Sequence, residues 1–295
     1  MKKLIIILAP MAGCGIYKPY TRPEEIKTDG LYGQGVETVD TMTLGNISWQ
    51  EMFTDPYLQQ LIQQGLDNNT DLQSAYWRVK EAEATLKSAR LAYLPSFNFA
   101  PNGGVSSLTN PWNATWTYTV PVTASWEVDI FGKLTNSKRR AKALLAQSQE
   151  YQQAVRTQVI ASVANLYYTL LMLDAQYEIS SETAEKWFET VNTMRAMKEA
   201  GMTNEAAVSQ AEANYYSIET SLFDLEYQME NSLSSLLGEA PRSFERGTLD
   251  EQILPENLVV GIPAQMLSNR PDVKNAEYSL AQAFYNTAGA RSAFY

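Results

Sequence analysis

Residues 115–130 read Thr-Trp-Thr-Tyr-Thr-Val-Pro-Val-Thr-Ala-Ser-Trp-Glu-Val-Asp-Ile. Apolar and polar side chains alternate along this stretch, with aromatic residues near both ends, which is typical of a β-strand that has lipid on one face and water on the other. A strand in a soluble antiparallel sheet would show the same alternation. Pro121 cannot donate to a strand ladder and predicts a bend or local break. The side chains expected to face lipid are Trp116, Tyr118, Val120, Val122 and Trp126.

A partner for this strand lies just before it in the chain. The only plausible one is Pro95–Ser107, which would reach Thr115–Ile130 across a turn containing Asn102-Gly103-Gly104. The two strands would form one hairpin at about residues 95–130. Because an isolated hairpin is not stable in water, and because long helices flank this one, the pattern favours a hairpin in a membrane.

Two helices are expected before the hairpin. Asp55 is a good N-cap acceptor and Pro56 a good first helical residue, so a helix should begin there. A second helix should follow Asn68-Asn69-Thr70 and stop at Pro95. Small residues in its apolar stripe permit close helix packing, and the stripe is Leu72, Ala75, Tyr76, Val79, Ala82, Leu86 and Ala89.

A much longer helix is expected after the hairpin. Residues 133–199 contain no proline or glycine, and a continuous helix of this size would be ~100 Å long. A return helix should run from about Asn204 to Leu237, which gives a helical hairpin whose tip is Ala200, Gly201, Met202 and Thr203. Apolar residues recur at spacings of three and four, as in coiled coils: Leu144, Tyr151, Val155, Val159, Val163, Leu166, Leu170, Leu173 and Tyr177.

The sequence contains an internal repeat. A shift of 201 residues places Asp71-Leu72-Gln73-Ser74-Ala75 on Asp272-Val273-Lys274-Asn275-Ala276, and the match continues to Phe294. We therefore expect a duplicated unit, with a second copy that is truncated before its membrane strand and a natural chain that continues. The expected divisions are a first repeat at 51–240, a linker at 241–262 and the start of the second repeat at 263–295.

The N-terminus has the layout of an export signal. Lys2 and Lys3 precede the apolar run Leu4–Leu8, which is too short to span a bilayer. The run ends at Ala12-Gly13-Cys14, which resembles the bacterial lipobox, so residues 1–13 are expected to be a lipoprotein signal peptide and Cys14 the lipidated residue. An ordinary signal peptide with an incidental cysteine is the alternative. Residues 14–50 would then be an extended arm that leads from the lipid anchor.

Composition argues against several classes of function. The chain has no histidine and one cysteine, which removes the commonest general base and most zinc or copper sites, so we expect no metal and no cofactor. A net charge of -10 argues against nucleic acid as a partner. The best evidence for an enzyme is the pair of carboxylates Glu127 and Asp129 on one strand face. Such residues more often line a polar lumen or start the next helix, so no catalytic residue is expected.

Taken together, these segments resemble the TolC-like outer-membrane factor family, in particular the lipoprotein branch that serves resistance-nodulation-division efflux pumps. The likeness covers nearly all of residues 14–295 and rests on the order and spacing of several short motifs. They are Trp49–Leu58, Asn69–Leu72 with Ala75, Trp126–Lys133, Leu236–Gly238, and Arg270–Asp272 with Ala276 and Glu277.

The resemblance implies a mainly α-helical fold with a membrane β-hairpin. It implies a homotrimer in the bacterial outer membrane, with four strands from each subunit in a shared twelve-stranded β-barrel and a helical tunnel in the periplasm. Four strands cannot close even an eight-stranded barrel, so the need for an oligomer also follows from the strand number. The family function is a passive exit duct that docks to a periplasmic adaptor and an inner-membrane transporter. The tip at Ala200–Thr203 resembles the adaptor-docking tip, while a structural coiled-coil lipoprotein spacer is the alternative function.

Overall fold

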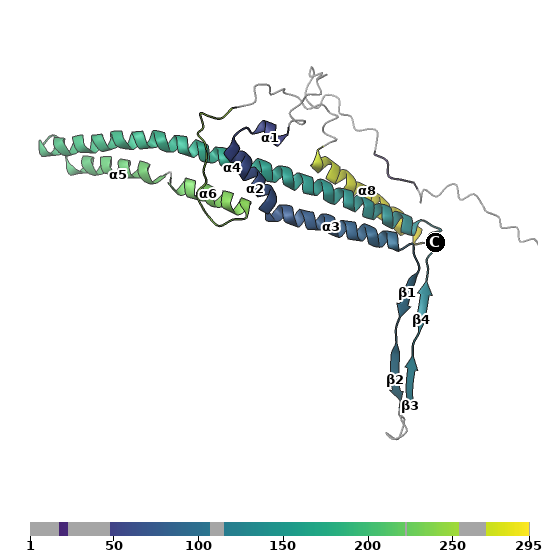
Figure 1. The fold of residues 1–295 in the computed structure, drawn as a ribbon. Helices are drawn as coiled ribbons and strands as arrows, with labels where there is room; N and C mark the ends of the chain where they lie inside the picture. The colour runs from purple at the N-terminus through teal and green to yellow at the C-terminus, as the bar shows by residue number, and fades with distance from the viewer. Residues whose placement is uncertain (1–17, 23–47, 107–114, 222, 254–269, 295) are drawn as a thin grey trace, which may run out of the picture. The chain divides into compact units, whose positions relative to one another are not determined.

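The computed structural model describes residues 18–22, 48–106, 115–221, 223–253 and 270–294 (Figure 1). The predicted signal peptide and Cys14 lie outside these residues. The described residues fall into two compact units. One unit holds residues 18–22, 77–106, 115–151 and 271–294, and the other holds residues 48–76, 152–221, 223–253 and 270.

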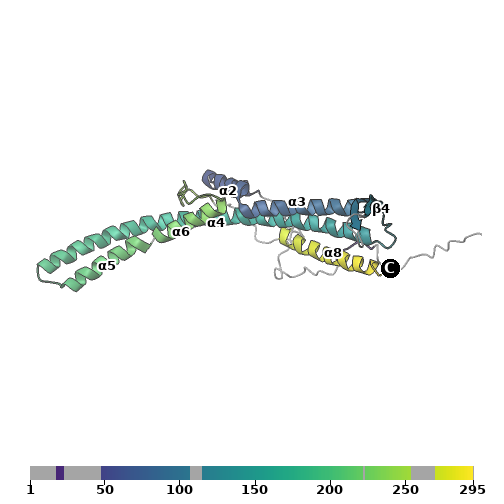
Figure 2. The same cartoon turned by 90° about the horizontal axis from the view of Figure 1, so that it is seen from below.

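Three helices meet in the first unit. They are α3 (Thr70–Leu91) from Trp77 onward, α4 (Lys133–Glu199) up to Tyr151, and α8 (Pro271–Ser292). Both views show α3 and α8 running along the first part of α4 (Figures 1 and 2). The bounds of α3 and α8 differ by 201 residues at each end, which is the shift of the sequence repeat. The buried apolar side chains are mostly small: Val79, Ala82, Leu86, Leu134, Ala141, Ala143, Ala281 and Ala288. Val79, Ala82 and Leu86 belong to the stripe predicted for α3, but Tyr76 of that stripe is 45% exposed.

The β-structure is a long two-stranded antiparallel ribbon. Strand β1 (Ser96–Phe99) pairs with β4 (Val122–Ser125), and β2 (Asn102–Ser106) pairs with β3 (Thr115–Thr119). The ladder is interrupted at Pro101 in one strand and at Pro121 in the other, where a bond of 3.4 Å from the Ala100 N–H to the Pro121 carbonyl bridges the gap. The break predicted from Pro121 is confirmed, and Pro101 matches it on the opposite strand.

Two sequence predictions about the ribbon are wrong. The strand expected to run to Ile130 ends at Ser125 in β4. Asn102-Gly103-Gly104 was expected to lie in the turn, but these residues form the start of β2 and pair with Thr119, Tyr118 and Thr117. Glycine weakens a strand because it offers no side chain to pack. The ring of Tyr118 covers this gap, since a Cβ placed on Gly103 would lie 3.4 Å from the ring. A cross-strand aromatic residue thus allows glycine in the ladder.

The register gives the ribbon two chemically distinct faces, because residues directly opposite each other point to the same side. The apolar face contains Phe97, Phe99, Gly103, Val105, Trp116, Tyr118, Val122 and Ala124. The polar face contains Ser96, Asn98, Asn102, Gly104, Ser106, Thr115, Thr117, Thr119, Thr123 and Ser125.

The second unit is built on the rest of α4, which packs against four shorter helices: α1 (Trp49–Met52), α2 (Pro56–Asn68), α5 (Glu205–Ser221) and α6 (Phe223–Leu237). Helix α2 begins as predicted, because the Asp55 carboxylate accepts from the Tyr57 N–H at 2.8 Å. Helices α5 and α6 occupy the span expected for the return helix, with residue 222 outside the described residues. The core consists of Leu58, Leu61, Ile62, Val159, Val163, Ala164, Tyr167, Leu170, Leu171, Leu233, Leu237 and Phe244.

The predicted stripe of α4 is correct from Val155 to Leu173, with Val155 and Leu166 only partly buried, and is wrong at Tyr151 and Tyr177. Val159, Val163 and Leu170 are buried, but the fully buried residue between them is Tyr167 rather than Leu166. Tyr151 and Tyr177 are 38% and 45% exposed. The spacing of apolar residues therefore locates the face of the helix, while the neighbouring elements decide which position is covered.

Candidate functional sites

The apolar face of the ribbon is exposed in this chain. The predicted lipid-facing residues Trp116, Tyr118, Val120, Val122 and Trp126 have exposed fractions of 64%, 75%, 63%, 69% and 64%. The rings of Trp116 and Tyr118 stack with their centroids 6.5 Å apart. Contiguous exposed apolar surface on a protein marks a place where another apolar surface binds. The ladder thus places Trp116, Tyr118 and Val122 on one exposed apolar face that can contact lipid or protein. Val120 and Trp126 lie outside the strands and are also exposed.

The root of the ribbon is tied to the helices by a polar network. The Trp126 indole N–H donates to the Tyr93 carbonyl at 3.0 Å, and the Tyr93 hydroxyl donates to Thr135 Oγ1 at 3.1 Å. The Asp129 carboxylate accepts from the Leu134 N–H at 2.9 Å and from the Thr135 N–H at 2.8 Å, so it caps α4.

The carboxylates considered for catalysis are both engaged in this network. Glu127 forms an ion pair of 2.8 Å with Lys133, and Asp129 binds the first turn of α4. These contacts fit the structural role of starting the next helix. Among the described residues, no group of three or more His, Cys, Asp or Glu side chains is placed to hold a metal ion.

The helical tip is a regular C-terminal helix cap. Gly201 has φ of 71°, its N–H donates to the Lys198 carbonyl at 2.9 Å, and the Met202 N–H donates to the Met197 carbonyl at 2.8 Å. This is the Schellman arrangement, in which glycine supplies the left-handed residue. Met202 is 72% exposed. The tip therefore presents a short backbone turn and one apolar side chain to the surroundings.

Cross-helix contacts hold the two sides of the tip together. Asn204 caps α5 by accepting from the Ala207 N–H at 3.0 Å. Arg195 on α4 pairs with Glu212 on α5 at 2.6 Å, and Lys198 pairs with Glu205. The turn is thus fixed from both helices, although such exposed ion pairs each contribute little to stability.

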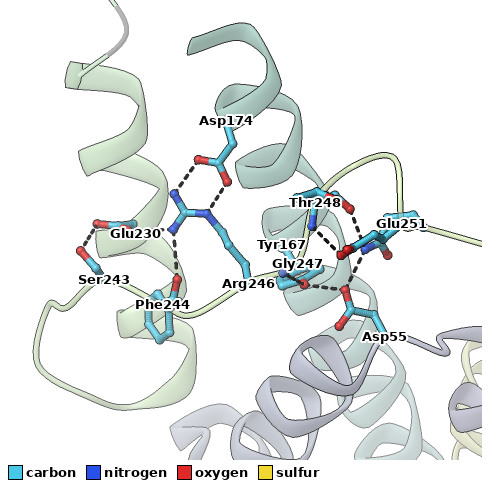
Figure 3. A network of polar contacts seen from close by, with 11 residues as sticks. Asp55, Tyr167, Asp174, Glu230, Ser243, Phe244, Arg246, Gly247, Thr248 and Glu251 are labelled. Carbon is cyan, nitrogen blue, oxygen red and sulfur yellow. Dashed lines mark hydrogen bonds and ion pairs between the residues drawn. The ribbon is translucent and has the colours of Figure 1, made fainter. Parts of the chain in front are cut away.

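A polar strap, residues 242–252, joins three helices of the second unit (Figure 3). The Arg246 guanidinium makes a bidentate pair with Asp174 of α4, at 2.5 and 2.7 Å, and a third bond to Glu230 of α6 at 3.1 Å. The Arg246 and Glu230 side chains are only 13% and 14% exposed. A planar guanidinium suits two carboxylates at once, and a lysine could not reproduce this geometry.

The strap also reaches α2 through Tyr167, which is fully buried. The Tyr167 hydroxyl donates to Asp55 Oδ2 at 2.6 Å and accepts from the Gly247 N–H at 3.1 Å (Figure 3). Gln252 donates to the same Asp55 oxygen at 2.8 Å. Burial, and then the bond to Asp55, raise the pKa of Tyr167, so this hydroxyl keeps its proton as a donor.

Opposing effects act on the pKa of Asp55. Burial works to raise it, but the bonds from Tyr167, from Gln252 and from the N–H groups of Tyr57 and Leu58 together outweigh burial. The pKa of Asp55 therefore lies below its ordinary value. The charged form of Asp55 is the one that the folded structure favours.

The sequence predicted only part of this strap. Asp55 was found as a helix cap, but residues 242–252 were assigned to a linker and Tyr167 and Arg246 were missed. Their partners are far away in the sequence, since Arg246 binds Asp174 and Tyr167 binds both Asp55 and Gly247. The one local signal was Tyr167 itself, a residue with a polar end within an apolar stripe.

Residues 18–22 lie against α8 in the first unit. The Tyr20 N–H donates to the Tyr285 hydroxyl at 3.0 Å, and the Tyr20 ring meets the Phe284 ring edge-on at 5.8 Å. Arg22 lies 3.7 Å from Glu277. The arm that the sequence predicts after Cys14 is thus attached to the helix at this point.

No helix within the described residues has both the length and the apolar content needed to cross a bilayer.

Comparison with known proteins gives consistent results. A family model described as outer membrane efflux protein matches residues 61–239. The chain is 30% identical to the probable efflux pump outer membrane protein TtgC of Pseudomonas putida, over 100% of this chain and 65% of the relative. It is 29% identical to the probable outer membrane lipoprotein SilC of Salmonella typhimurium, over 97% of this chain and 63% of the relative.

Solved structures agree with these relatives. The open-state outer membrane channel MtrE of Neisseria gonorrhoeae matches with a TM-score of 0.71 and 26% identity, over 88% of this chain and 59% of that structure. The chain therefore spans slightly less than two thirds of the length of the curated relatives named here.

Proposed function

The chain belongs to the outer membrane efflux protein family, and on this basis we propose that it is the outer-membrane channel component of a tripartite efflux pump. In this role it is a passive exit duct for solutes, docked to a periplasmic adaptor and an inner-membrane transporter. The observation that carries the proposal is the ribbon, which has one apolar and one polar face and is continuous with a helix of 67 residues. A coiled-coil spacer has no use for such a ribbon.

The ribbon also supports assembly as a homotrimer. Within the described residues β1 pairs only with β4 and β2 only with β3, so each strand has one free edge. In a bilayer every backbone N–H and C=O needs a partner, because lipid offers none. Neighbouring strands must supply these partners, and copies of the same chain around a shared β-barrel do so. The apolar face then contacts lipid and the polar face lines the passage.

The lipid anchor at Cys14 fits the attachment of the arm. Cys14 precedes Tyr20 by six residues, which span at most ~20 Å. Tyr20 is bound to Tyr285, and seven further residues, ~10 Å of helix, lead to the end of α8. Gly289, in this last turn, lies beside Asn136 at the start of α4, where the ribbon ends. The acyl chains can therefore enter the outer membrane close to the root of the ribbon.

We assign adaptor docking to the tip, Ala200–Thr203. It follows the C-terminus of α4, whereas the ribbon precedes the N-terminus of that helix, so the two ends of α4 serve different partners. Ala200, Gly201 and Met202 are exposed and Thr203 is partly buried. The chain works as a conduit without a catalytic step, which is consistent with the structural engagement of Glu127 and Asp129.

A matched pair of substitutions tests the membrane role. Val122 lies on the apolar face opposite Phe99, and the next residue, Thr123, lies on the polar face opposite Asn98. Arginine on a lipid-facing strand costs about 2–4 kcal/mol near the bilayer centre. Val122→Arg should therefore abolish outer-membrane assembly and efflux in a strain that lacks the native gene, while Thr123→Arg should still assemble. Equal assembly of the two variants, measured in outer-membrane fractions, would contradict the proposal.

A further inference from the structure

The ribbon and its surroundings in the sequence carry no charge. Residues 91–126 contain no Asp, Glu, Lys, Arg or His, although the whole chain has 23 basic and 33 acidic residues. This stretch includes both strands and the residues between them. The charged side chains of the given sequence therefore all lie outside this stretch.

The polar face is built from hydroxyl and amide groups. Its cross-strand pairs include Ser96 with Ser125, whose hydroxyls lie 2.7 Å apart, and Asn98 with Thr123. The first acidic residue after the ribbon, Glu127, is neutralised by Lys133 at 2.8 Å. Hydroxyl and amide groups both donate and accept hydrogen bonds, so they solvate anions, cations and neutral polar solutes alike.

We infer that the wall formed by the polar face does not select solutes by charge, so that cargo of either sign, or of none, passes this section equally. The inference rests on the proposed function, since it requires this face to line the passage. A single fixed charge ~7 Å away in water would change the local concentration of a monovalent ion roughly threefold. No side chain of this ribbon supplies such a charge.

Single cysteines on the two faces test this inference in outer-membrane vesicles from cells that express the full-length protein. Thr117→Cys places a thiol on the polar face and Tyr118→Cys places one on the apolar face. Each variant is treated at low salt with a cationic and an anionic methanethiosulfonate reagent of similar size. The protein without an added cysteine gives the background, and a small free thiol gives the intrinsic ratio of the two rates.

The expected ratio of cationic to anionic rates at Thr117→Cys lies within about threefold of that of the free thiol. Adding Thr119→Asp, two residues along on the same face, should shift this ratio five- to tenfold towards the cationic reagent, which shows that the assay detects one charge. A ratio at Thr117→Cys that already differs more than tenfold from the free thiol overturns the inference. The proposed function fails separately if Tyr118→Cys reacts as fast as Thr117→Cys, because the apolar face would then be in water.

Discussion

Two glycines close helices with nearly the same backbone geometry but have different surroundings. Gly201 at the tip has φ of 71°, and Gly238 at the end of α6 has φ of 72°. A Cβ placed on Gly201 meets nothing within 4 Å. A Cβ placed on Gly238 would lie 2.9 Å from the carbonyl oxygen of Asn68. Alanine at position 201 therefore adds backbone strain alone, whereas alanine at position 238 adds the same strain and a steric overlap.

The two costs can be worked out from this geometry. A left-handed conformation costs a residue with a Cβ about 1–2 kcal/mol, which is partly offset because alanine has fewer unfolded conformations. Gly201→Ala should thus destabilise the protein by about 1 kcal/mol. Gly238→Ala carries the same strain and must also displace the end of α2, since overpacking costs a further 1–3 kcal/mol or so. We expect about 2–4 kcal/mol for this variant.

Urea unfolding of the purified protein in detergent, followed by the helical circular dichroism signal, measures the two changes. The unfolding midpoint should fall clearly further for Gly238→Ala than for Gly201→Ala. Equal losses would refute the reasoning, because they would mean that contact with Asn68 does not decide the cost.

The same tip glycine tests docking. A Cβ on Gly201 meets nothing within 4 Å, and Gly201→Trp shares the backbone strain of Gly201→Ala, so both variants should assemble normally. If the tip binds an adaptor, Gly201→Trp alone should lose export, because the bulky ring blocks close approach to the backbone turn. A photo-crosslinker at Met202 should capture the adaptor. Normal export by Gly201→Trp together with no captured partner would leave the tip as a turn only.

Three further predictions concern the strap and the anchor. Because the pKa of Asp55 is held below its ordinary value in the folded protein, its stabilising effect is present above about pH 4 and is lost as the pH falls through the folded pKa. Asp55→Asn should therefore cost about 1 kcal/mol at pH 7 in urea unfolding, and a difference from wild type that does not shrink below about pH 4 would contradict this. Arg246→Lys should cost about 1–2 kcal/mol, since it loses the bidentate pair with the half-exposed Asp174, whereas Arg242→Lys, at the exposed pair with Glu239, should cost under about 1 kcal/mol. Cells fed labelled palmitate should label the wild type but not Cys14→Ser, and equal labelling of both would rule out lipidation at Cys14.

Local signals in the sequence were enough to predict helix ends and strand faces. Asp55 and Pro56 fix the start of α2, and Gly201 and Gly238 fix the ends of α4 and α6, because caps depend on a few adjacent residues. The two faces of the ribbon follow from alternation alone. Contacts between distant segments could not be predicted, since nothing near Arg246 in the chain indicates that Asp174 is its partner. The sequence predicted Gly103 and Gly104 in a turn. The ring of Tyr118, which covers Gly103 in the ladder, comes from the opposite strand, so no residue near the glycines indicates that they can lie in a strand.

The internal repeat distinguishes features of a helix that local sequence sets from features that packing sets. Helices α3 and α8 have corresponding ends 201 residues apart, yet they bury different faces. Val79, Ala82 and Leu86 are buried in α3, whereas the matching Leu280, Ala283 and Thr287 of α8 are exposed. Helix α8 instead buries Ala281, Ala288 and Ser292. A repeated sequence therefore reproduces the bounds of a helix, but the face that a helix buries is set by the neighbour against which it packs.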